Sequence, residues 1–249
     1  MREIDKLGLD KITLEAVINK IVSGNVKLVS FSGPMGAGKD TIAPLVMEKI
    51  TDKPIVKVSF AESLREEVNK IIDFVKYTYG DDKFYDKFSK KFDEYDRDHI
   101  DYVVGLIVDD LCKSPDLNAY DRTPGMRRVL QYWATEVRRE VDPVYWVRQG
   151  VFKIFTEVLN NNSVFITDAR FINELTILRS LECIEVLLEV SREEQIRRIQ
   201  ARDNIVPSEE ALTHVSDLEL KEYDDFDIIV DTSSNDIDNT VKQILEQIL

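Results

Sequence analysis

The chain has 249 residues, of which 43% are hydrophobic and 32% charged, and its formal net charge is −14. This length can bury a large apolar core in one domain, or in a core domain with an insertion, and the acidity excludes a broad basic surface for sequence-independent nucleic-acid binding. Cys112 and Cys183 stand singly in apolar runs, which predicts buried, reduced thiols without a disulfide or metal. No apolar run has the length of a membrane span and no signal peptide is visible, so we expect a cytoplasmic location without membrane contact.

An amphipathic helix is expected within residues 1–25, and five short apolar runs after it predict strands. Helical patterns separate these runs, which favours a wound α/β sheet. Four runs are almost continuously apolar, as is typical of parallel strands covered on both faces. The predicted strands are residues 26–31, 55–60, 164–167, 184–190 and 226–230.

A glycine-rich segment, Gly-Pro-Met-Gly-Ala-Gly-Lys-Asp-Thr, follows the first predicted strand and precedes a helical pattern. Glycines let the backbone wrap closely, so that successive N–H groups can point at phosphate oxygens. The positive end of the next helix and the Lys39 cation add attraction for the β- and γ-phosphates of a nucleotide. This context indicates a phosphate loop rather than a plain turn, in which the lysine would have no task. The candidate nucleotide-binding residues are Gly33, Gly36, Ala37, Gly38, Lys39, Asp40 and Thr41.

Asp40 stands where phosphate loops usually have Ser or Thr, whose hydroxyl binds Mg²⁺. A carboxylate also suits the ion, directly or through water, because Mg²⁺ prefers oxygen ligands and keeps several waters. Asp40 is therefore a candidate metal ligand, and Mg²⁺ is an expected cofactor.

Arg65 follows the second predicted strand and lies off the apolar stripe of the next helix. Open parallel sheets bind ligands outside the carboxyl ends of their strands, so Arg65 is placed to reach a second phosphate. A surface arginine paired with Glu62 or Glu66 is the alternative, and position alone does not separate the two.

The second and third predicted strands are far apart in the sequence, and helices must fill the stretch between them. Its middle, residues 77–121, is rich in Asp, Lys, Tyr and Phe. We expect a helical insertion there, packed beside the sheet or acting as a mobile cap.

A further helix is predicted after Thr123, a favoured cap residue, with Pro124 in its first turn. Its apolar stripe leaves a polar face at three- and four-residue spacing. Guanidinium, amide and hydroxyl groups on one face suit a phosphate and the polar edges of a base, and a solvated surface is the alternative. The face carries Arg128, Gln131, Thr135 and Arg138.

Trp146 belongs to the next predicted helix, which starts at Asp142 and Pro143. It falls outside the apolar stripe of that helix, on the side of Gly150 and Lys153. A large aromatic side chain on a polar face can stack on a base, and packing against the insertion is an equal alternative.

The third predicted strand ends in Asp168-Ala169-Arg170, with Glu174 four residues after the arginine. Charged groups at this end of a central strand are expected to face the ligand crevice. Asp168 is a candidate to hold Mg²⁺ through water or to bind an acceptor, whereas an Arg170–Glu174 helix pair is the structural alternative.

Ser191 begins a predicted helix with Glu194 in capping-box register. Four arginines within eleven residues of an acidic protein predict a lid, residues 191–217, that closes over polyphosphate. His214 in this lid is expected to form local hydrogen bonds rather than to act as a base. The four arginines are Arg192, Arg197, Arg198 and Arg202.

Taken together, these stretches resemble the deoxynucleoside monophosphate kinases of the bacteriophage type, a branch of the phosphate-loop kinases. The resemblance covers residues 27–249, with its motifs in order and at compatible spacing, and Gly-Lys-Asp-Thr at 38–41 looks normal for the family. It implies a three-layer α/β kinase fold with a five-stranded parallel sheet, forming one domain over residues 1–249. In that domain residues 27–76 and 122–249 are the core, 77–121 a helical insertion and 191–217 the lid. The other matching pieces are residues 61–65, 127–136, 145–146, 168–174, 213–217 and 227–231.

The resemblance also implies roles for the candidate residues. ATP and Mg²⁺ are bound by the loop residues together with Arg192 and Asp168. The phosphoryl group in transfer is acted on by Lys39, Arg128, Arg197 and Arg198. Arg65 and Arg128 take the acceptor phosphate. The implied lining of the acceptor nucleoside pocket is Gln131, Thr135, Trp146, Asp168, Arg170 and Glu174.

The expected activity is ATP-dependent phosphorylation of deoxynucleoside 5′-monophosphates to diphosphates, which supplies DNA precursors. We expect small nucleotides as partners, no direct contact with nucleic acid, and a cytoplasmic location (the host cytoplasm if a bacteriophage encodes the chain). The sequence does not decide whether the chain forms a homodimer. The alternatives are a kinase similar to dephospho-coenzyme A kinase, and a nucleotide-binding switch that acts through a partner.

Overall fold

The computed structural model of this chain describes residues 4, 7–51, 53–92, 95–121, 123–204, 206–207, 212, 220–234 and 236–249. Its contacts divide the chain into two compact units. We call residues 1–60 and 150–249 the sheet unit, and residues 61–149 the helical unit. In the described part of the chain no helix is long and apolar enough to cross a membrane.

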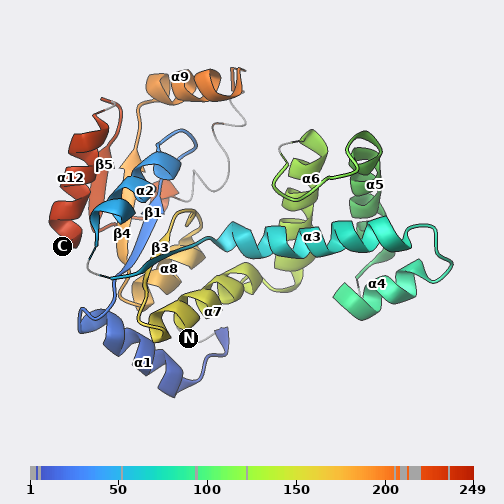
Figure 1. The fold of residues 1–249 in the computed structure, drawn as a ribbon, viewed down its shortest axis with the longest axis horizontal. Coiled ribbons are helices and arrows are strands. Elements are labelled where there is room, and N and C mark those ends of the chain that lie inside the picture. The colour runs from blue at the N-terminus through green and yellow to red at the C-terminus, as the bar shows by residue number, and fades with distance from the viewer. Residues whose placement is uncertain are drawn as a thin grey trace. The chain divides into compact units, whose positions relative to one another are not determined.

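The sheet unit is built on a parallel sheet, to which the described residues contribute five strands in the spatial order β2-β3-β1-β4-β5 (Figure 1). In its centre Ser30 of β1 pairs in register with Ile166 of β3 and Glu185 of β4. All five predicted strands are present, so the α/β class and the parallel sheet are confirmed. The strands are β1 (Leu28–Ser32), β2 (Ile55–Val58), β3 (Ser163–Ile166), β4 (Ile184–Glu189) and β5 (Ile228–Asp231).

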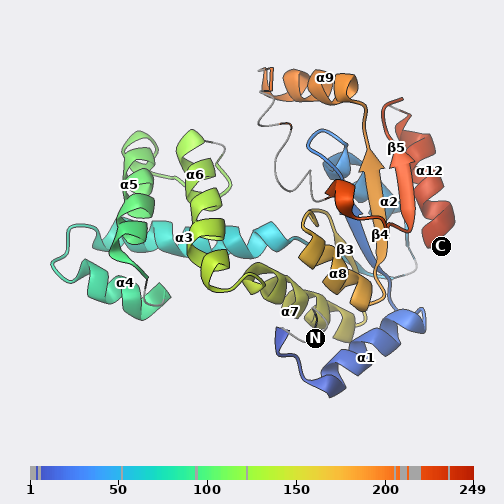
Figure 2. The ribbon, with the colours of Figure 1, turned by 180° about the vertical axis from the view of Figure 1, so that it is seen from behind.

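Helices cover both faces of this sheet (Figures 1 and 2). On one face α2 (Lys39–Lys49) and α12 (Ile237–Ile248) pack over an apolar cluster that includes Phe31 and Phe165. On the other face α8 (Ile172–Ser180) reaches β4 through an ion pair between Arg179 and Glu185. The buried strand residues therefore alternate between two helical layers. Among the described residues, the other helices of the unit are α1 (Lys11–Val22), α9 (Arg192–Asp203), the 3-10 helix Leu220–Glu222 and the C-terminal part of α7 (Tyr145–Leu159).

Because the strands are parallel, their carboxyl ends meet at one edge of the sheet. The loop after β1 leads into α2, the loop after β3 into α8, and β4 is followed at once by α9. The glycine-rich segment lies in the loop after β1 and Asp168 in the loop after β3, and the arginine-bearing helix follows β4. The fold thus gathers three of the predicted motifs at the edge where such sheets bind ligands.

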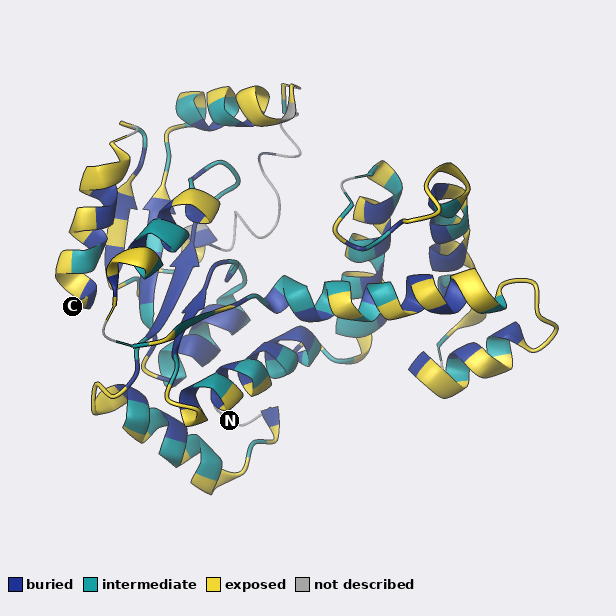
Figure 3. Cartoon of the chain, in the orientation of Figure 1, coloured by how far each residue is buried: buried dark blue, intermediate teal, exposed yellow. Residues whose placement is uncertain are grey.

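The helical unit packs a separate aromatic core, seen as the dark stripe of its helices in Figure 3. Phe74, Phe88 and Trp133 are buried, and the rings of Phe74 and Phe88 meet edge-on at 5.6 Å. The predicted insertion, residues 77–121, contains two of the helices packed around this core. The elements are α3 (Phe60–Thr78), which enters from the sheet unit, α4 (Phe84–Phe92), α5 (Arg97–Lys113), α6 (Pro124–Tyr132), the π-helix Trp133–Arg139 and the start of α7.

Candidate functional site

The glycine-rich loop lies between the central strand β1 and helix α2. Gly33, Gly36 and Gly38 all have positive φ, at 142°, 84° and 95°, which explains the choice of glycine at each position. At Gly33 space adds to the constraint, because a Cβ atom there would lie 2.3 Å from the carbonyl oxygen of Leu188 in β4. The loop thus has the tight, left-handed turns from which a cradle of backbone N–H groups can be made.

Lys39 is the first residue of α2, and its side chain turns back over the loop. The amino group donates to the carbonyl of Gly33 and, at 3.0 Å, to that of Pro34. The residue is only 7% exposed. A buried cation is thereby held across the mouth of the loop, where it suits a phosphate ligand. Asp40 and Thr41, in the same helical turn, are exposed.

Three successive carbonyl groups of the loop are bonded from outside by side chains. Nε2 of Gln195 donates to Met35 at 2.9 Å, and Nη1 of Arg198 donates to Gly36 at 3.1 Å. The hydroxyl of Thr232, just after β5, lies 3.0 Å from the Ala37 carbonyl and 2.9 Å from that of Glu189, and shares its proton between them. The motif reasoning missed Gln195 and Thr232. Thr232 follows a strand at the ligand edge, which is a usable signal, whereas Gln195 lies unmarked among the arginines of α9.

The arginine-bearing helix forms as predicted, with Ser191 as its cap. Glu194 pairs with Arg197 at 2.6 Å and with Arg198 at 2.7 Å, which raises the pKa of Arg197. Arg192 donates to Gln195 and to the carbonyl of Leu212. The carboxylate therefore offsets part of the positive charge that sequence reasoning expects at this helix. Much of the predicted lid lies outside the described residues, including residues 213–217 with His214.

Asp168, at the end of β3, accepts hydrogen bonds at the start of α3. Its Oδ2 atom accepts from the Ser59 hydroxyl at 2.6 Å and its Oδ1 atom from the Phe60 N–H at 3.0 Å. Within the described residues no group of three or more acidic, His or Cys side chains could hold a metal.

Glu174 is buried and caps α8, because its Oε2 atom accepts from the N–H groups of Arg170 at 2.9 Å and Phe171 at 3.2 Å. Ser32, at the end of β1, donates to the carbonyl of Ala169 at 3.0 Å. Asp168 and Arg170 thus lie in a loop that is tied to the strand leading into the glycine-rich loop.

A pocket of about 160 Å³ opens beside the glycine-rich loop. One wall is formed by the start of α2 and the opposite wall by the segment after β5 and the first turn of α12. It brings Arg198 and Thr232 together with apolar Ile42 and Ile237. The lining residues are Ala37, Gly38, Thr41, Ile42, Arg198, Thr232, Ile237 and Thr240.

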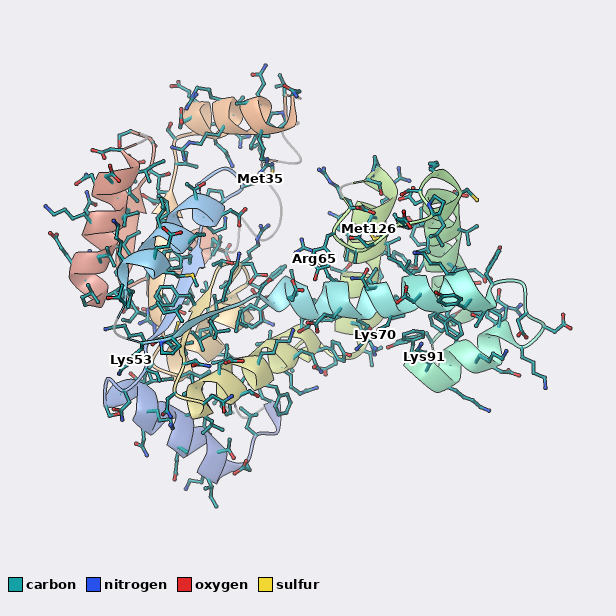
Figure 4. All side chains as sticks on the ribbon, in the orientation of Figure 1. Met35, Lys53, Arg65, Lys70, Lys91 and Met126 are labelled. Carbon is teal, nitrogen blue, oxygen red and sulfur yellow. The ribbon has the colours of Figure 1, made fainter. Side chains whose placement is uncertain are left out.

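The helical unit holds the other candidates. Arg65 on α3, labelled in Figure 4, lies over the ring of Tyr120 at 5.4 Å, and Tyr120 bonds Glu62 through its hydroxyl. Arg128 and Gln131 are exposed on α6. Thr135 is also exposed and donates to the carbonyl of Gln131 at 2.7 Å. The predicted cap at Thr123 and the apolar stripe of the helix are present.

Trp146 differs from the expectation of an aromatic ring on a polar face. It is only 3% exposed in the core of the helical unit, and its Nε1 atom donates to the carbonyl of Ala134 at 3.2 Å. The structure therefore shows Trp146 packed inside the helical unit, which was the alternative to stacking on a base. Helical periodicity failed here because the first turn of α7 is covered on more than one side by its own unit.

No family model matches the sequence, and no curated protein matches it. Among solved structures, the crystal structure of TT1252 from Thermus thermophilus is similar, with 15% sequence identity and a TM-score of 0.49. The match covers 90% of this chain and 98% of that one.

Proposed function

We propose that the protein is an ATP- and Mg²⁺-dependent kinase that transfers the γ-phosphoryl group to a deoxynucleoside 5′-monophosphate. The observation that carries the proposal is the phosphate loop after the central strand: three glycines of positive φ, with the Lys39 amino group buried across the turn. A lysine held at that point suits the β- and γ-phosphates of a nucleotide.

The donor nucleotide would bind along this loop. Backbone N–H groups of residues 33–38 would hold its phosphates, with Lys39 and Arg192 adding charge. The neighbouring pocket, which combines Arg198 with apolar side chains, suits a planar base that can stack on a guanidinium and pack on aliphatic groups. Thr41 lies in the first turn of α2 and also lines the pocket, so it stands between the proposed phosphate and base positions of this donor site.

Mg²⁺ would be held by Asp40 and Asp168, and its chemistry would be to neutralise charge on the phosphate oxygens and keep them oriented. Asp40 stands free of the core on the first turn of α2, where a carboxylate is also favoured by the helix dipole. Asp168 lies at the end of β3, and its carboxylate also accepts hydrogen bonds from Ser59 and Phe60.

The acceptor would be recognised by a separate set of side chains. Arg65 and Arg128 are proposed to take its 5′-phosphate, because a guanidinium binds phosphate oxygens in pairs. Further polar groups that the family resemblance implies would contact the sugar and base. These are Gln131, Thr135, Asp168, Arg170 and Glu174, while the burial of Trp146 favours a supporting position in the core over stacking on the base.

Catalysis in this proposal is positional and electrostatic. A monophosphate acceptor is already an anion, so the reaction needs little proton transfer. Lys39 and the arginines Arg128, Arg197 and Arg198 would neutralise the charge that spreads over the transferring group while the two substrates are held in line.

The test is a panel of ribo- and deoxynucleoside monophosphates with ATP and Mg²⁺, with nucleoside diphosphates measured by chromatography. The proposal expects diphosphate from at least one deoxynucleotide, with ADP formed in equal amount. Product from dephospho-coenzyme A alone would favour the related small-molecule kinase. Release of ADP and free phosphate without any acceptor product would instead indicate a hydrolytic switch.

A further inference from the structure

Gln195 is a polar side chain in α9 that no motif identifies, yet only 4% of it is exposed. Its amide nitrogen donates to the Met35 carbonyl at 2.9 Å, and its amide oxygen accepts from Arg192 at 3.2 Å. Both ends of the amide are therefore used, which fixes its orientation. Figure 4 shows Met35 in the loop beneath α9.

Helix α9 also packs closely against the loop at Gly36. A Cβ atom at Gly36 would lie 3.4 Å from the Cγ atom of Gln195 and 3.4 Å from a side-chain carbon of Ile199. The next carbonyl groups, those of Gly36 and Ala37, accept from Arg198 and Thr232. Three consecutive peptide groups are thus bonded on their outer side.

The direction of each carbonyl decides the direction of the next N–H group, because a trans peptide is planar and carries the two on opposite sides. A carbonyl held outward at Met35 turns the N–H of Gly36 inward, and one held outward at Ala37 does the same for Gly38. The N–H between them, at Ala37, closes a turn on the carbonyl of Pro34 at 3.2 Å. An anion in the loop would meet donors that are already oriented, which lowers the entropy cost of binding it.

We propose that Gln195 is a positioning residue for the phosphate loop: its buried amide holds the Met35 peptide so that the loop is ready to bind the phosphates of the donor nucleotide. The inference rests on the proposed function for the identity of the donor. Its own test requires only that the loop binds an anion, whatever the substrate is.

The experiment compares Gln195→Met and Gln195→Glu, which keep the side-chain length but remove the donor to Met35. Gln200→Glu, an exposed change on the same helix, is the control. Titration calorimetry measures binding of ATP, inorganic tripolyphosphate and adenosine. Steady-state kinetics give the KM of ATP and of the acceptor, and thermal unfolding reports stability.

In both Gln195 variants ATP and tripolyphosphate should bind about 5- to 12-fold more weakly, the change expected for losing one hydrogen bond of about 1–1.5 kcal/mol. Adenosine binding and the KM of the acceptor should stay close to the control, whereas the unfolding temperature should fall moderately below it, because a buried side chain loses a hydrogen bond. A merely structural role would weaken binding of both substrates together, and that result would overturn the inference.

Should a Gln195 variant not fold, Thr232→Val removes the hydroxyl next to Ala37 and is expected to weaken tripolyphosphate binding likewise; adenosine is not compared for this variant, because Thr232 also lines the proposed base pocket. Unchanged tripolyphosphate affinity in the folded variants would overturn the positioning role. A wild-type protein that binds tripolyphosphate but transfers no phosphate would refute the proposed reaction, while the Gln195 comparison would still decide this inference. A wild-type protein that binds neither ATP nor tripolyphosphate would refute both.

Discussion

A side chain at position 33 would meet the backbone of the neighbouring strand, and this makes Gly33 a sensitive residue of the loop. Its φ of 142° is one constraint, and the 2.3 Å that would separate an added Cβ atom from the Leu188 carbonyl oxygen is a second, independent one. Gly24 shares only the first constraint, since its φ is 71° and nothing lies within 4 Å of its Cβ position. The two glycines therefore separate backbone strain from collision.

Gly33→Ala should lower the free energy of unfolding by about 1–3 kcal/mol more than Gly24→Ala, since β1 and β4 must separate to admit the methyl group. It should also weaken tripolyphosphate binding, because the start of the loop shifts. Chemical unfolding and calorimetry of both variants check this. Equal losses of stability in the two variants would show that the contact with Leu188 yields without cost.

Glu185 is a buried carboxyl in the centre of the sheet unit, and burial raises its pKa to about 7 although Tyr223 and Arg179 oppose the shift. Tyr223 donates to its Oε2 atom at 2.5 Å, and Arg179 lies 2.9 Å from the same oxygen. Asp227, which binds Arg179 at 2.7 Å and the backbone N–H of Glu185 at 2.8 Å, adds negative charge beside it.

The folded protein should hold this proton up to a pH of about 7, whereas the unfolded chain releases it near the ordinary pKa of 4.5. Unfolding between these values releases a proton, so this group's contribution to stability falls as pH rises from 4.5 to 7 and is constant above. The difference in unfolding free energy between wild type and Glu185→Gln should follow that slope. Urea unfolding at several pH values, with exposed Glu182→Gln as the control, measures it; a difference that is constant across the range contradicts the assignment.

Among the elements, the helical unit is held together by a polar cluster as well as by its aromatic core. Glu67 of α3 accepts from Trp133 at 2.6 Å, from Arg138 at 2.7 Å and from the Tyr145 hydroxyl at 2.9 Å. The guanidinium of Arg138 also lies over the Tyr145 ring at 4.4 Å. One carboxylate thus connects α3, the π-helix and the start of α7.

Glu67→Leu should destabilise the helical unit by about 3–5 kcal/mol, because it removes the carboxylate partner of a largely buried guanidinium. Both tryptophans of the chain, Trp133 and Trp146, are in this unit, so their fluorescence follows its unfolding. Glu140→Leu changes an exposed glutamate of the same unit and serves as the control. A midpoint in urea equal to that of Glu140→Leu would mean that the cluster adds nothing to stability.

The strands and the tight turns of the glycine-rich loop could be predicted because their signals are local. Apolar runs mark strands that are covered on both faces, and the glycine spacing marks a turn that few other residues can form. Trp146 could not be placed, since a single helical stripe does not show that a second surface covers the first turn of α7. The contacts of Asp168 with Ser59 and Phe60, and of Gln195 with Met35, join segments distant in sequence, and no periodicity or spacing reports them.

For the whole molecule, the proposed function divides the work between the two units. The loop, Lys39 and the pocket beside Arg198 form the proposed donor site in the sheet unit, whereas Arg65 and Arg128 of the proposed acceptor site belong to the helical unit. Changes at Arg65 or Arg128 should therefore affect the acceptor more than ATP.

Arg128→Ala and Arg65→Ala should weaken binding of the monophosphate by about 10- to 150-fold, the range expected when a charge-assisted hydrogen bond is lost, and leave ATP binding nearly unchanged. Arg127→Ala, an exposed change next to Arg128, is the control. Equilibrium titration with each ligand separates the two effects. If ATP and monophosphate lose affinity equally, these arginines do not belong to a separate acceptor site.

The proposed kinase activity is tested most directly by following the γ-phosphate of ATP. ATP labelled at that phosphate is incubated with Mg²⁺, a mixture of deoxynucleoside monophosphates and either the wild-type protein or Lys39→Ala. We expect the wild type to move the label into a deoxynucleoside diphosphate, and the variant to do so at least roughly 100-fold more slowly while remaining folded. Label that appears only as free phosphate, or transfer that is as fast in the variant as in the wild type, would contradict the proposed activity.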